Sequence, residues 1–306
     1  MQRRRSFIKT TLSGSFLLAS AQFPLNAFHD EPDLTKITIL HTNDVHSRID
    51  PFPMDGGRNA GMGGAAKRAK LIEKIKGQEQ NVLLFDSGDI FQGTPYFNFF
   101  GGELEIKLMS KMGYDASTIG NHDFDAGIDG FDKQLKHANF PFIISNYNFD
   151  NTILHNKTQK HKVFEIGGIK IGVIGVGIAL DGLVPDSLYK ETQYLDPILH
   201  AQENAAILKK EKKCDYVICL SHLGYNYNSA KVSDVLLAQN TNDIDMILGG
   251  HTHTFMRSPD IRRNKSGNEV IVTQAGWGGI LLGRIDVYFE KNKKNKCMTC
   301  KNTLIK

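Results

Sequence analysis

Five short motifs rich in Asp, His and Asn occur along the chain, and each follows a segment that the sequence predicts to be a strand. Ligands of α/β proteins collect where strands end, so residues far apart in the sequence can meet there. Carboxylate oxygens, amide oxygens and neutral imidazole nitrogens are suitable ligands for Zn, Fe and Mn ions. The motifs are Asp44-Val45-His46, Asp86-Ser87-Gly88-Asp89, Gly120-Asn121-His122-Asp123-Phe124-Asp125, Ser221-His222-Leu223-Gly224 and Gly249-Gly250-His251-Thr252-His253.

The first two motifs supply carboxylates. Asp44 and His46 are two residues apart, so in extended backbone both side chains point the same way and can reach one ion. A solvated turn would explain that pair about as well. Asp89 follows an apolar strand, where an anion is costly unless it is paired or bound to a metal. We expect Asp89 to bridge two cations and Asp86 to be a structural hydrogen-bond acceptor.

The third motif carries more polar groups than a helix start requires. Asn121 offers an amide oxygen to a metal without adding charge. His122 and Asp125 are three residues apart, so on a helical turn Asp125 can fix the tautomer of His122. The alternative is that Asn121 and Asp123 only cap the next helix.

The last two motifs supply imidazoles. A lone histidine such as His222, directly after a buried strand, is usually a satisfied core residue. His251 and His253 form a more specific signal, because the preceding glycines let the backbone come close to an ion or a phosphate. Chance could produce any one of the five motifs, but all five in this order at strand ends indicate a metal centre.

These motifs resemble those of the calcineurin-like metallophosphoesterases, whose pattern is D-x-H, G-D, G-N-H-[DE], a later H and G-H-x-H. The segment 40–46 and the motif 120–125 are similar to the catalytic domain of bacterial 5′-nucleotidases, and the resemblance spans about residues 36–289. It implies two divalent metal ions, which could be Mn, Zn or Fe. By this resemblance the first ion is held by Asp44, His46, Asp89 and His253, and the second by Asp89, Asn121, His222 and His251.

The resemblance also implies hydrolysis of phosphate esters, most specifically by a 5′-nucleotidase-type phosphomonoesterase. Two cations lower the pKa of a water between them, and the bridging hydroxide attacks phosphorus in line. His122, oriented by Asp125, is the expected catalytic pair, which stabilises the transition state or protonates the leaving oxygen. Many nucleotidases of this family carry Gln where this chain has His253, so the substrate and the metal stay open.

Other activities fit the same ligand set. They are a cyclic-nucleotide phosphodiesterase, a nucleotide-sugar hydrolase and the related dimetal thiosulfohydrolase. A non-catalytic metal-binding subunit is the alternative from another class, but it has no need for the pair His122 and Asp125.

The expected partner is a phosphate-ester substrate, specifically a nucleotide. Two-domain nucleotidases of this family continue into a C-terminal nucleoside-binding domain, whereas this chain ends shortly after its last catalytic-domain strand. We therefore expect either that the substrate is held mainly by its phosphate or that a separate nucleoside-binding domain protein completes the site. Asn146 matches a family Asn near the active site, with an ordinary loop Asn as the equal alternative.

The net charge of +4 lies mostly at the two ends of the chain and forms no basic stripe, which argues against binding of nucleic acid.

Residues 1–27 are predicted to be an export signal. The head Arg3-Arg4-Arg5-Ser6-Phe7-Ile8-Lys9 precedes a weakly apolar run, 10–21, that is too short to span a bilayer. It resembles a twin-arginine signal, with a general secretory signal as the alternative. We expect a periplasmic protein without stable membrane insertion once the signal is removed.

Strands and helices alternate along the rest of the chain, which has 306 residues, 41% of them hydrophobic. This pattern predicts an α/β fold, a layered sandwich of two mixed β-sheets flanked by helices, in one domain over residues 35–290. A Lys-rich tail, 291–306, is expected to follow, in which Cys297 and Cys300 form a local disulfide or have no role; Cys214 and Cys219 are expected to be buried. Strands are predicted over 36–41, 81–86, 116–119, 140–145, 162–165, 169–175, 216–221, 244–248, 270–275 and 281–289, and helices over 60–76, 103–112, 198–213 and 231–239.

Overall fold

A computed structural model describes residues 34–290 and 296–306, without the side chains of residues 296–298, 300 and 301. The expected export signal lies outside the described residues. No helix in the described part of the chain combines the length and the hydropathy that a membrane span requires.

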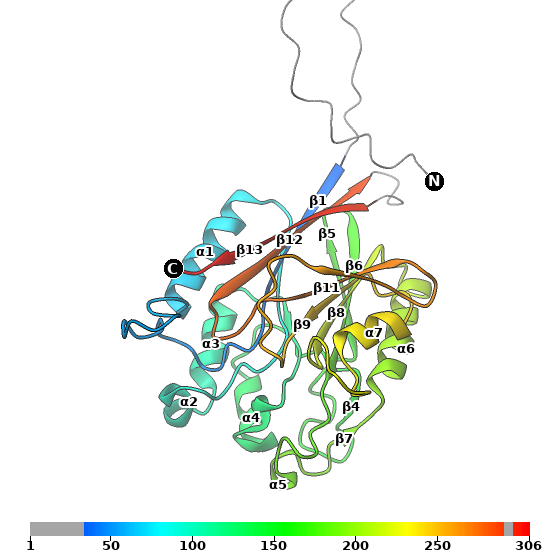
Figure 1. The fold of residues 1–306 in the computed structure, drawn as a ribbon. Helices are drawn as coiled ribbons and strands as arrows, with labels where there is room; N and C mark the ends of the chain where they lie inside the picture. The colour runs from blue at the N-terminus through cyan, green and yellow to red at the C-terminus, as the bar shows by residue number, and fades with distance from the viewer. Residues whose placement is uncertain (1–33, 291–295) are drawn as a thin grey trace, which may run out of the picture. The chain divides into compact units, whose positions relative to one another are not determined.

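Two β-sheets pack against each other, and helices cover their outer faces (Figure 1). The first sheet has the order β13-β12-β1-β2-β3, in which β1, β2 and β3 are parallel and β12 and β13 are antiparallel to their neighbours. Its strands are β1 (Leu34–Thr42), β2 (Val82–Asp86), β3 (Ala116–Ser117), β12 (Leu281–Glu290) and β13 (Lys296–Leu304).

The second sheet has the order β10-β11-β9-β8-β6-β5. Its four central strands are parallel, and its two edge strands are antiparallel to their neighbours. The strands are β5 (His161–Ile166), β6 (Ile169–Gly177), β8 (Tyr216–His222), β9 (Met246–Gly249), β10 (Asp260–Arg263) and β11 (Glu269–Gln274). Strands β4 (Tyr147–Asn148) and β7 (Gln193–Tyr194) pair with each other and form a separate two-stranded sheet. The predicted fold class is thereby confirmed.

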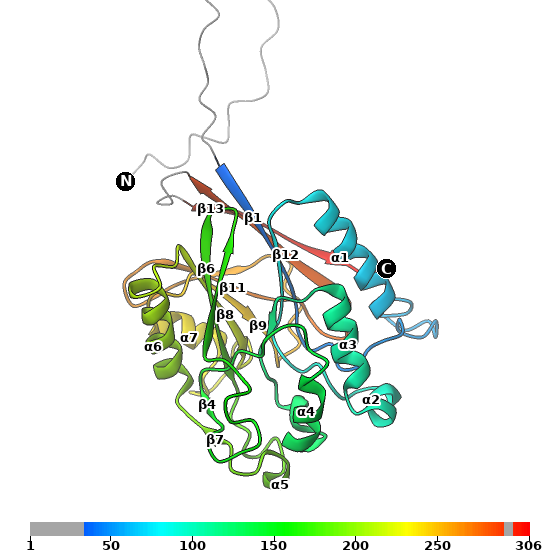
Figure 2. The same ribbon diagram turned by 180° about the vertical axis from the view of Figure 1, so that it is seen from behind.

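The helices divide between the two outer faces, as the view from behind shows (Figure 2). α1 (Ala65–Gln78) and α3 (Glu103–Met112) lie on the side of the first sheet, and α6 (Pro197–Lys210) and α7 (Asp234–Asn240) on the side of the second. The shorter elements are α2 (Pro95–Phe100), the 3₁₀ turn η1 (His122–Phe124), α4 (Gly127–Leu135) and α5 (Asp186–Tyr189).

The central strands are buried on both faces, as their continuous apolar runs predict. In β2, Leu83 and Phe85 pack between the sheets, whereas Leu84 faces the helices of the first sheet. In β8, Ile218 and Leu220 likewise pack between the sheets. This double burial fixes the strands, and it thereby fixes the loops that follow them.

Three differences from the local predictions bear on the fold. The helix expected from residue 60 begins at Ala65, because Gly61, Gly63 and Gly64 have positive φ angles that no helix contains. Segment 140–145 makes isolated bridges, Ser117 with Phe142 and Ile143 with Gln159, rather than a strand.

The third difference concerns the tail. It carries β13, which pairs with β12 along nine residues, so the sheet continues beyond residue 290. Cys214 and Cys219 are buried and free, as expected. The side chains of Cys297 and Cys300 are not described.

Candidate metal centre

The five motifs lie in loops at the carboxyl ends of parallel strands. Asp44 follows β1, Asp89 follows β2 and Asn121 follows β3 in the first sheet, while His222 ends β8 and His251 follows β9 in the second. Parallel strands place their carboxyl ends at one edge, where α/β proteins bind ligands. The face-to-face packing of the sheets brings the two sets of loops together.

Asp44, His46 and His253 form a first group, with ligand atoms all within 4.8 Å of one another. The Nε2 atoms of His46 and His253 are 3.1 Å apart, and His253 Nε2 lies 3.4 Å from Asp44 Oδ1. His46 Nδ1 lies 3.2 Å from the carbonyl oxygen of Phe91. Because that oxygen can only accept, Nδ1 carries the proton, and the lone pair of Nε2 points into the group.

Asp89, His222 and His251 form a second group of the same kind. The Nδ1–H of His222 donates to the carbonyl oxygen of Ser87 at 2.7 Å, which again leaves Nε2 as the free nitrogen. His222 Nε2 is fully buried and has no hydrogen-bond partner of acceptable geometry, although Asp89 Oδ2 lies 3.1 Å away. Asn121 Oδ1 adds an amide oxygen 2.9 Å from His251 Nδ1.

Asp89 lies between the two groups. Its Oδ2 is 3.1 Å from His222 Nε2 in one group and 3.8 Å from His46 Nε2 in the other. One carboxylate shared by two imidazole-rich groups is the arrangement that a bridging ligand requires. The orphaned nitrogen of His222, the facing nitrogens of His46 and His253, and the N and O donor set all fit two divalent cations.

The electrostatics of the centre also favour a cation beside Asp89. Burial lowers the pKa of His222, but the negative charge of Asp89 outweighs it and raises that pKa to about 10. Burial alone would raise the pKa of Asp89, yet the charge of His222 holds it below its usual range. Burial lowers the pKa of His251 to about 4 and also lowers that of His46, which keeps both imidazoles in the neutral form that binds metals.

His122 and Asp125 form a separate pair beside the first group. His122 Nδ1 lies 2.8 Å from Asp125 Oδ2 across the 3₁₀ turn η1, as the spacing predicted. The backbone N–H of His122 donates to Asp89 Oδ1 at 2.8 Å, and its ring centroid is 5.3 Å from that of His46. The hydrogen bond with Asp125 raises the pKa of His122. The His122 side chain is 38% exposed, so it borders the centre without being enclosed in it.

The backbone at the centre is strained. Positive φ angles of 50–71° occur at five of the seven candidate ligands, where a side chain disfavours them: Asp44, His46, Asp89, His251 and His253. Such conformations cost about 1–3 kcal/mol each and persist only where surrounding bonds determine them. Two of those bonds join the loops directly, from Asp44 N to Gly88 O at 2.9 Å and from His46 N to Asp89 O at 3.1 Å.

Further buried polar residues hold these loops. Asn43 donates to Asp44 Oδ2 at 2.5 Å and to the carbonyl oxygen of Gly276 at 2.6 Å, and its Oδ1 accepts from Ala275 N. Asp234, whose pKa burial raises to about 7, accepts from Ser221 Oγ and from Gln274 Nε2. No sequence signal points to Asp234 and Gln274, because each looks like an ordinary residue at the start of a helix or the end of a strand.

The structure also shows the surroundings of Asp86, which was expected to be structural, and of Asn146, whose role was left open. Asp86 accepts from Thr42 Oγ1, Gly88 N and Ser117 Oγ, so it is a structural acceptor. Asn146 exchanges two hydrogen bonds with the backbone of Gly177 and joins that strand end to its own loop.

Comparison with known proteins agrees with this arrangement. The model of the calcineurin-like phosphoesterase family matches residues 37–255. A 5′-nucleotidase of Vibrio parahaemolyticus is 33% identical over 95% of this chain and 55% of its own length.

Solved structures extend the similarity to the fold. The 5′-nucleotidase precursor of Thermus thermophilus has a TM-score of 0.79 and 29% identity, over 89% of this chain and 55% of that one. The NAD nucleotidase of Haemophilus influenzae has a TM-score of 0.79 and 28% identity, over 89% of this chain and 56% of that one. The chain thus spans about half the length of these relatives. It belongs to the calcineurin-like phosphoesterases, a family whose members use two divalent metal ions.

Proposed function

We propose that the protein is a two-metal phosphomonoesterase of the 5′-nucleotidase type that hydrolyses nucleotides. One observation carries this proposal: Asp89 belongs to one of two groups of metal-ligating side chains and also approaches the other, and the pair of His122 and Asp125 stands beside them. The similarity to nucleotidases supports a nucleotide as the substrate.

The residues divide into two ligand sets. Asp44, His46, Asp89 and His253 would hold one ion, and Asp89, Asn121, His222 and His251 the other. Bound ions supply positive charge that neutralises the phosphoryl oxygens and lowers the pKa of the attacking water. The strained loops hold the ligand atoms in place beforehand, so binding an ion or a phosphate requires little reorganisation.

His122 would act on the leaving group. Asp125 holds its Nδ1, and Nε2 has no hydrogen-bond partner among the described residues. With both ring nitrogens protonated, Nδ1–H donates to Asp125, and Nε2–H is available to the oxygen that leaves phosphorus. Asp125 thereby orients the imidazole and stabilises its positive charge.

The test is an assay of the purified, metal-loaded chain on AMP, a cyclic nucleotide, a nucleotide sugar and an aryl phosphate, with metal analysis alongside. We expect phosphate release from AMP and the aryl phosphate that requires divalent ions. Asp89→Asn should lose both bound metal and turnover, whereas Asp150→Asn, at an exposed carboxylate, should keep both. Faster turnover of the cyclic nucleotide or the nucleotide sugar than of AMP would contradict a phosphomonoesterase. A fully loaded protein that hydrolyses none of the four would contradict an enzyme.

We propose further that residues 1–27 direct export to the periplasm by the twin-arginine route. The support is the run Arg4-Arg5 before Ser6-Phe7-Ile8-Lys9. Replacing Arg4 and Arg5 together by Lys should retain the precursor in the cytoplasm, while Arg3→Lys should export normally. Unchanged export of the double variant would instead indicate a general secretory signal.

A further inference from the structure

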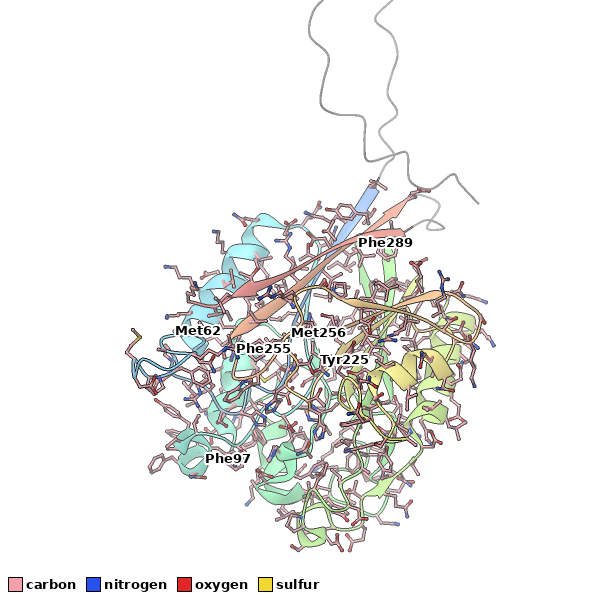
Figure 3. All side chains as sticks on the ribbon, in the orientation of Figure 1. Met62, Phe97, Tyr225, Phe255, Met256 and Phe289 are labelled. Carbon is pink, nitrogen blue, oxygen red and sulfur yellow. The ribbon has the colours of Figure 1, made fainter. Side chains whose placement is uncertain are left out.

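A pocket of about 570 Å³ adjoins the metal centre, and its volume lies within the range of small-molecule sites. Its walls come from the loop at residues 58–62, the segment 255–257 and the loop that carries Trp277, with the ends of β12 and β13 behind them. Figure 3 labels Met62, Phe255 and Met256, three of the residues that line it.

One wall of this pocket is shared with the metal centre. The indole of Trp277 stacks on the imidazole of His253, with ring centroids 5.6 Å apart and an interplanar angle of 11°. The ring of Phe52 packs edge-on against Trp277 at 5.3 Å, and the next residue, Gly278, donates its N–H to the carbonyl oxygen of Asp44 at 2.7 Å. Trp277 therefore packs against one candidate metal ligand, and its neighbour is bonded to a second, which places the pocket beside the metal centre.

A second aromatic side chain, Phe255, comes from the segment after β9 that also carries His251 and His253. Phe255 lies two residues after His253 and is 45% exposed. A Cβ on Gly276 would lie 2.4 Å from the Phe255 ring, so glycine at this position lets the ring lie against the backbone beside Trp277. The pocket thus presents exposed aromatic surface of the kind on which planar bases stack.

The charge of the pocket is positive and unpaired. Arg58 and Arg257 line it, and neither has a hydrogen bond or an ion pair with any described residue. No described residue of its lining is acidic. A guanidinium group matches the geometry of a phosphate and binds it with two parallel hydrogen bonds. Two such groups, left free at an aromatic pocket, match a ligand that is both planar and anionic.

We propose that this pocket binds the leaving group of the substrate and favours nucleoside diphosphates, in which an anhydride bond joins the terminal phosphate to a leaving group that carries both an aromatic base and a second phosphate. The inference rests on the proposed function, because the phosphate to be released must lie at the metal centre. Water adds to the terminal phosphorus, the bond to the bridging oxygen breaks, and the products are orthophosphate and a nucleoside monophosphate, with a proton released to solvent. The base stacks in the pocket while the retained phosphate pairs with Arg58 and Arg257.

Trp277 reports directly on the occupancy of this pocket, because it is the only tryptophan in the chain. The full chain, stripped of metal so that no hydrolysis occurs, is titrated with ADP, adenosine and ribose 5-phosphate while tryptophan fluorescence is followed. We expect ADP to change the fluorescence at concentrations about a hundredfold lower than adenosine does, the difference that two charge-assisted hydrogen bonds, one from each arginine, supply. Ribose 5-phosphate should leave the fluorescence unchanged.

Variants separate the two features of the pocket. Arg58→Gln and Arg257→Gln should each raise the Kd of ADP by about tenfold and leave that of adenosine unchanged. Phe255→Leu should weaken both ligands. The matched controls are Arg263→Gln and Phe99→Leu, at exposed positions outside the pocket lining, and both should bind like the wild type.

In the metal-loaded enzyme, kcat/KM should be higher for ADP than for AMP, and Arg257→Gln should remove the difference. Equal responses to all three ligands, or wild-type affinity for ADP in both arginine variants, would overturn the pocket proposal. The two proposals fail separately. If the chain binds ADP selectively but releases no phosphate, the pocket proposal stands and the phosphomonoesterase proposal is refuted. If the chain releases phosphate but does not bind ADP selectively, the phosphomonoesterase proposal stands and the pocket proposal is refuted.

Discussion

The carboxylate of Asp123 accepts the backbone N–H of Asp89 at 3.0 Å, and so holds the residue that lies between the two ligand groups. Its Oδ2 also accepts from Gly120 N, and its Oδ1 accepts from Ile90 N and Phe91 N at 2.9 and 3.2 Å. Four N–H groups converge on one buried carboxylate. These four hydrogen bonds explain how the loop can keep Asp89 at a positive φ.

Asp123→Asn should therefore loosen the metal centre without removing a ligand. An amide cannot replace the carboxylate, because either orientation of the asparagine aims its NH₂ group at two N–H donors. We expect metal affinity to fall by about 10–100-fold, as for other residues that orient ligands. Calorimetric titration of the metal-free protein measures this change. Asp129→Asn, at an exposed ion pair with Lys190, is the control that should bind metal normally. Wild-type affinity in Asp123→Asn would mean that the loop is held by other contacts.

His122→Ala should separate catalysis from metal binding. The imidazole borders the first group but pairs with Asp125 rather than with a ligand, so metal content should stay near that of the wild type. Turnover should fall by about 10²–10⁴-fold, the usual contribution of a general acid. His155→Ala tests the same change at an exposed surface pair, 3.3 Å from Asp150, and should keep full turnover. Loss of metal in His122→Ala would assign His122 to the ligands instead.

Chelation of the metals should lower the thermal stability of the protein. Ions that bind only the folded state stabilise it by about 2.7 kcal/mol at a free concentration of 100 times the Kd. The measurement is the Tm with chelator and after an excess of Mn or Zn is restored. Asp89→Asn should show a much smaller shift, because Asp89 belongs to both ligand sets. Identical Tm values of the wild type under the two conditions would contradict binding of metal at this centre.

Gly175→Ala should destabilise the second sheet. A Cβ at this position would lie 1.9 Å from the carbonyl oxygen of Ile143, a backbone atom that cannot rotate away. We expect a loss of at least about 1–3 kcal/mol in the free energy of unfolding, as in other overpacked cores. Gly77→Ala in α1 meets nothing within 4 Å and should instead stabilise the protein by up to about 1 kcal/mol. Urea unfolding of both variants measures the difference. Equal stabilities of the two variants would show that the backbone at Ile143 can shift to make room for the Cβ.

Elements with a strong local signal were predicted closely. Helix α3 begins at Glu103 and ends at Met112, the predicted limits, because its apolar spacing is regular and Gly113 stops it with a positive φ. Strand β2 was predicted to within one residue of its limits, because its run of apolar residues suits only a strand buried on both faces. These signals lie within the segments themselves, so they need no knowledge of the rest of the fold.

Elements that depend on a distant partner were missed. Strand β13 is rich in lysine and polar residues, and only its pairing with β12 makes it a strand. Strand β10 is likewise stabilised by β11 rather than by its own composition. The pocket beside Trp277 has no sequence signal at all, because Arg58 and Arg257 are nearly two hundred positions apart and neither belongs to a motif.

The sequence by itself determined which side chains of this protein could bind metal, because buried strands that end in Asp, His and Asn need a cation to make burial tolerable. Only the tertiary structure decided how those side chains are grouped. His46 and His253 face each other at 3.1 Å across 207 positions of chain, and Asp89 reaches both groups, because two sheets pack with their strand ends together. Local chemistry is written in residue types and spacings, whereas the distances between ligands depend on burying apolar surface across the whole domain.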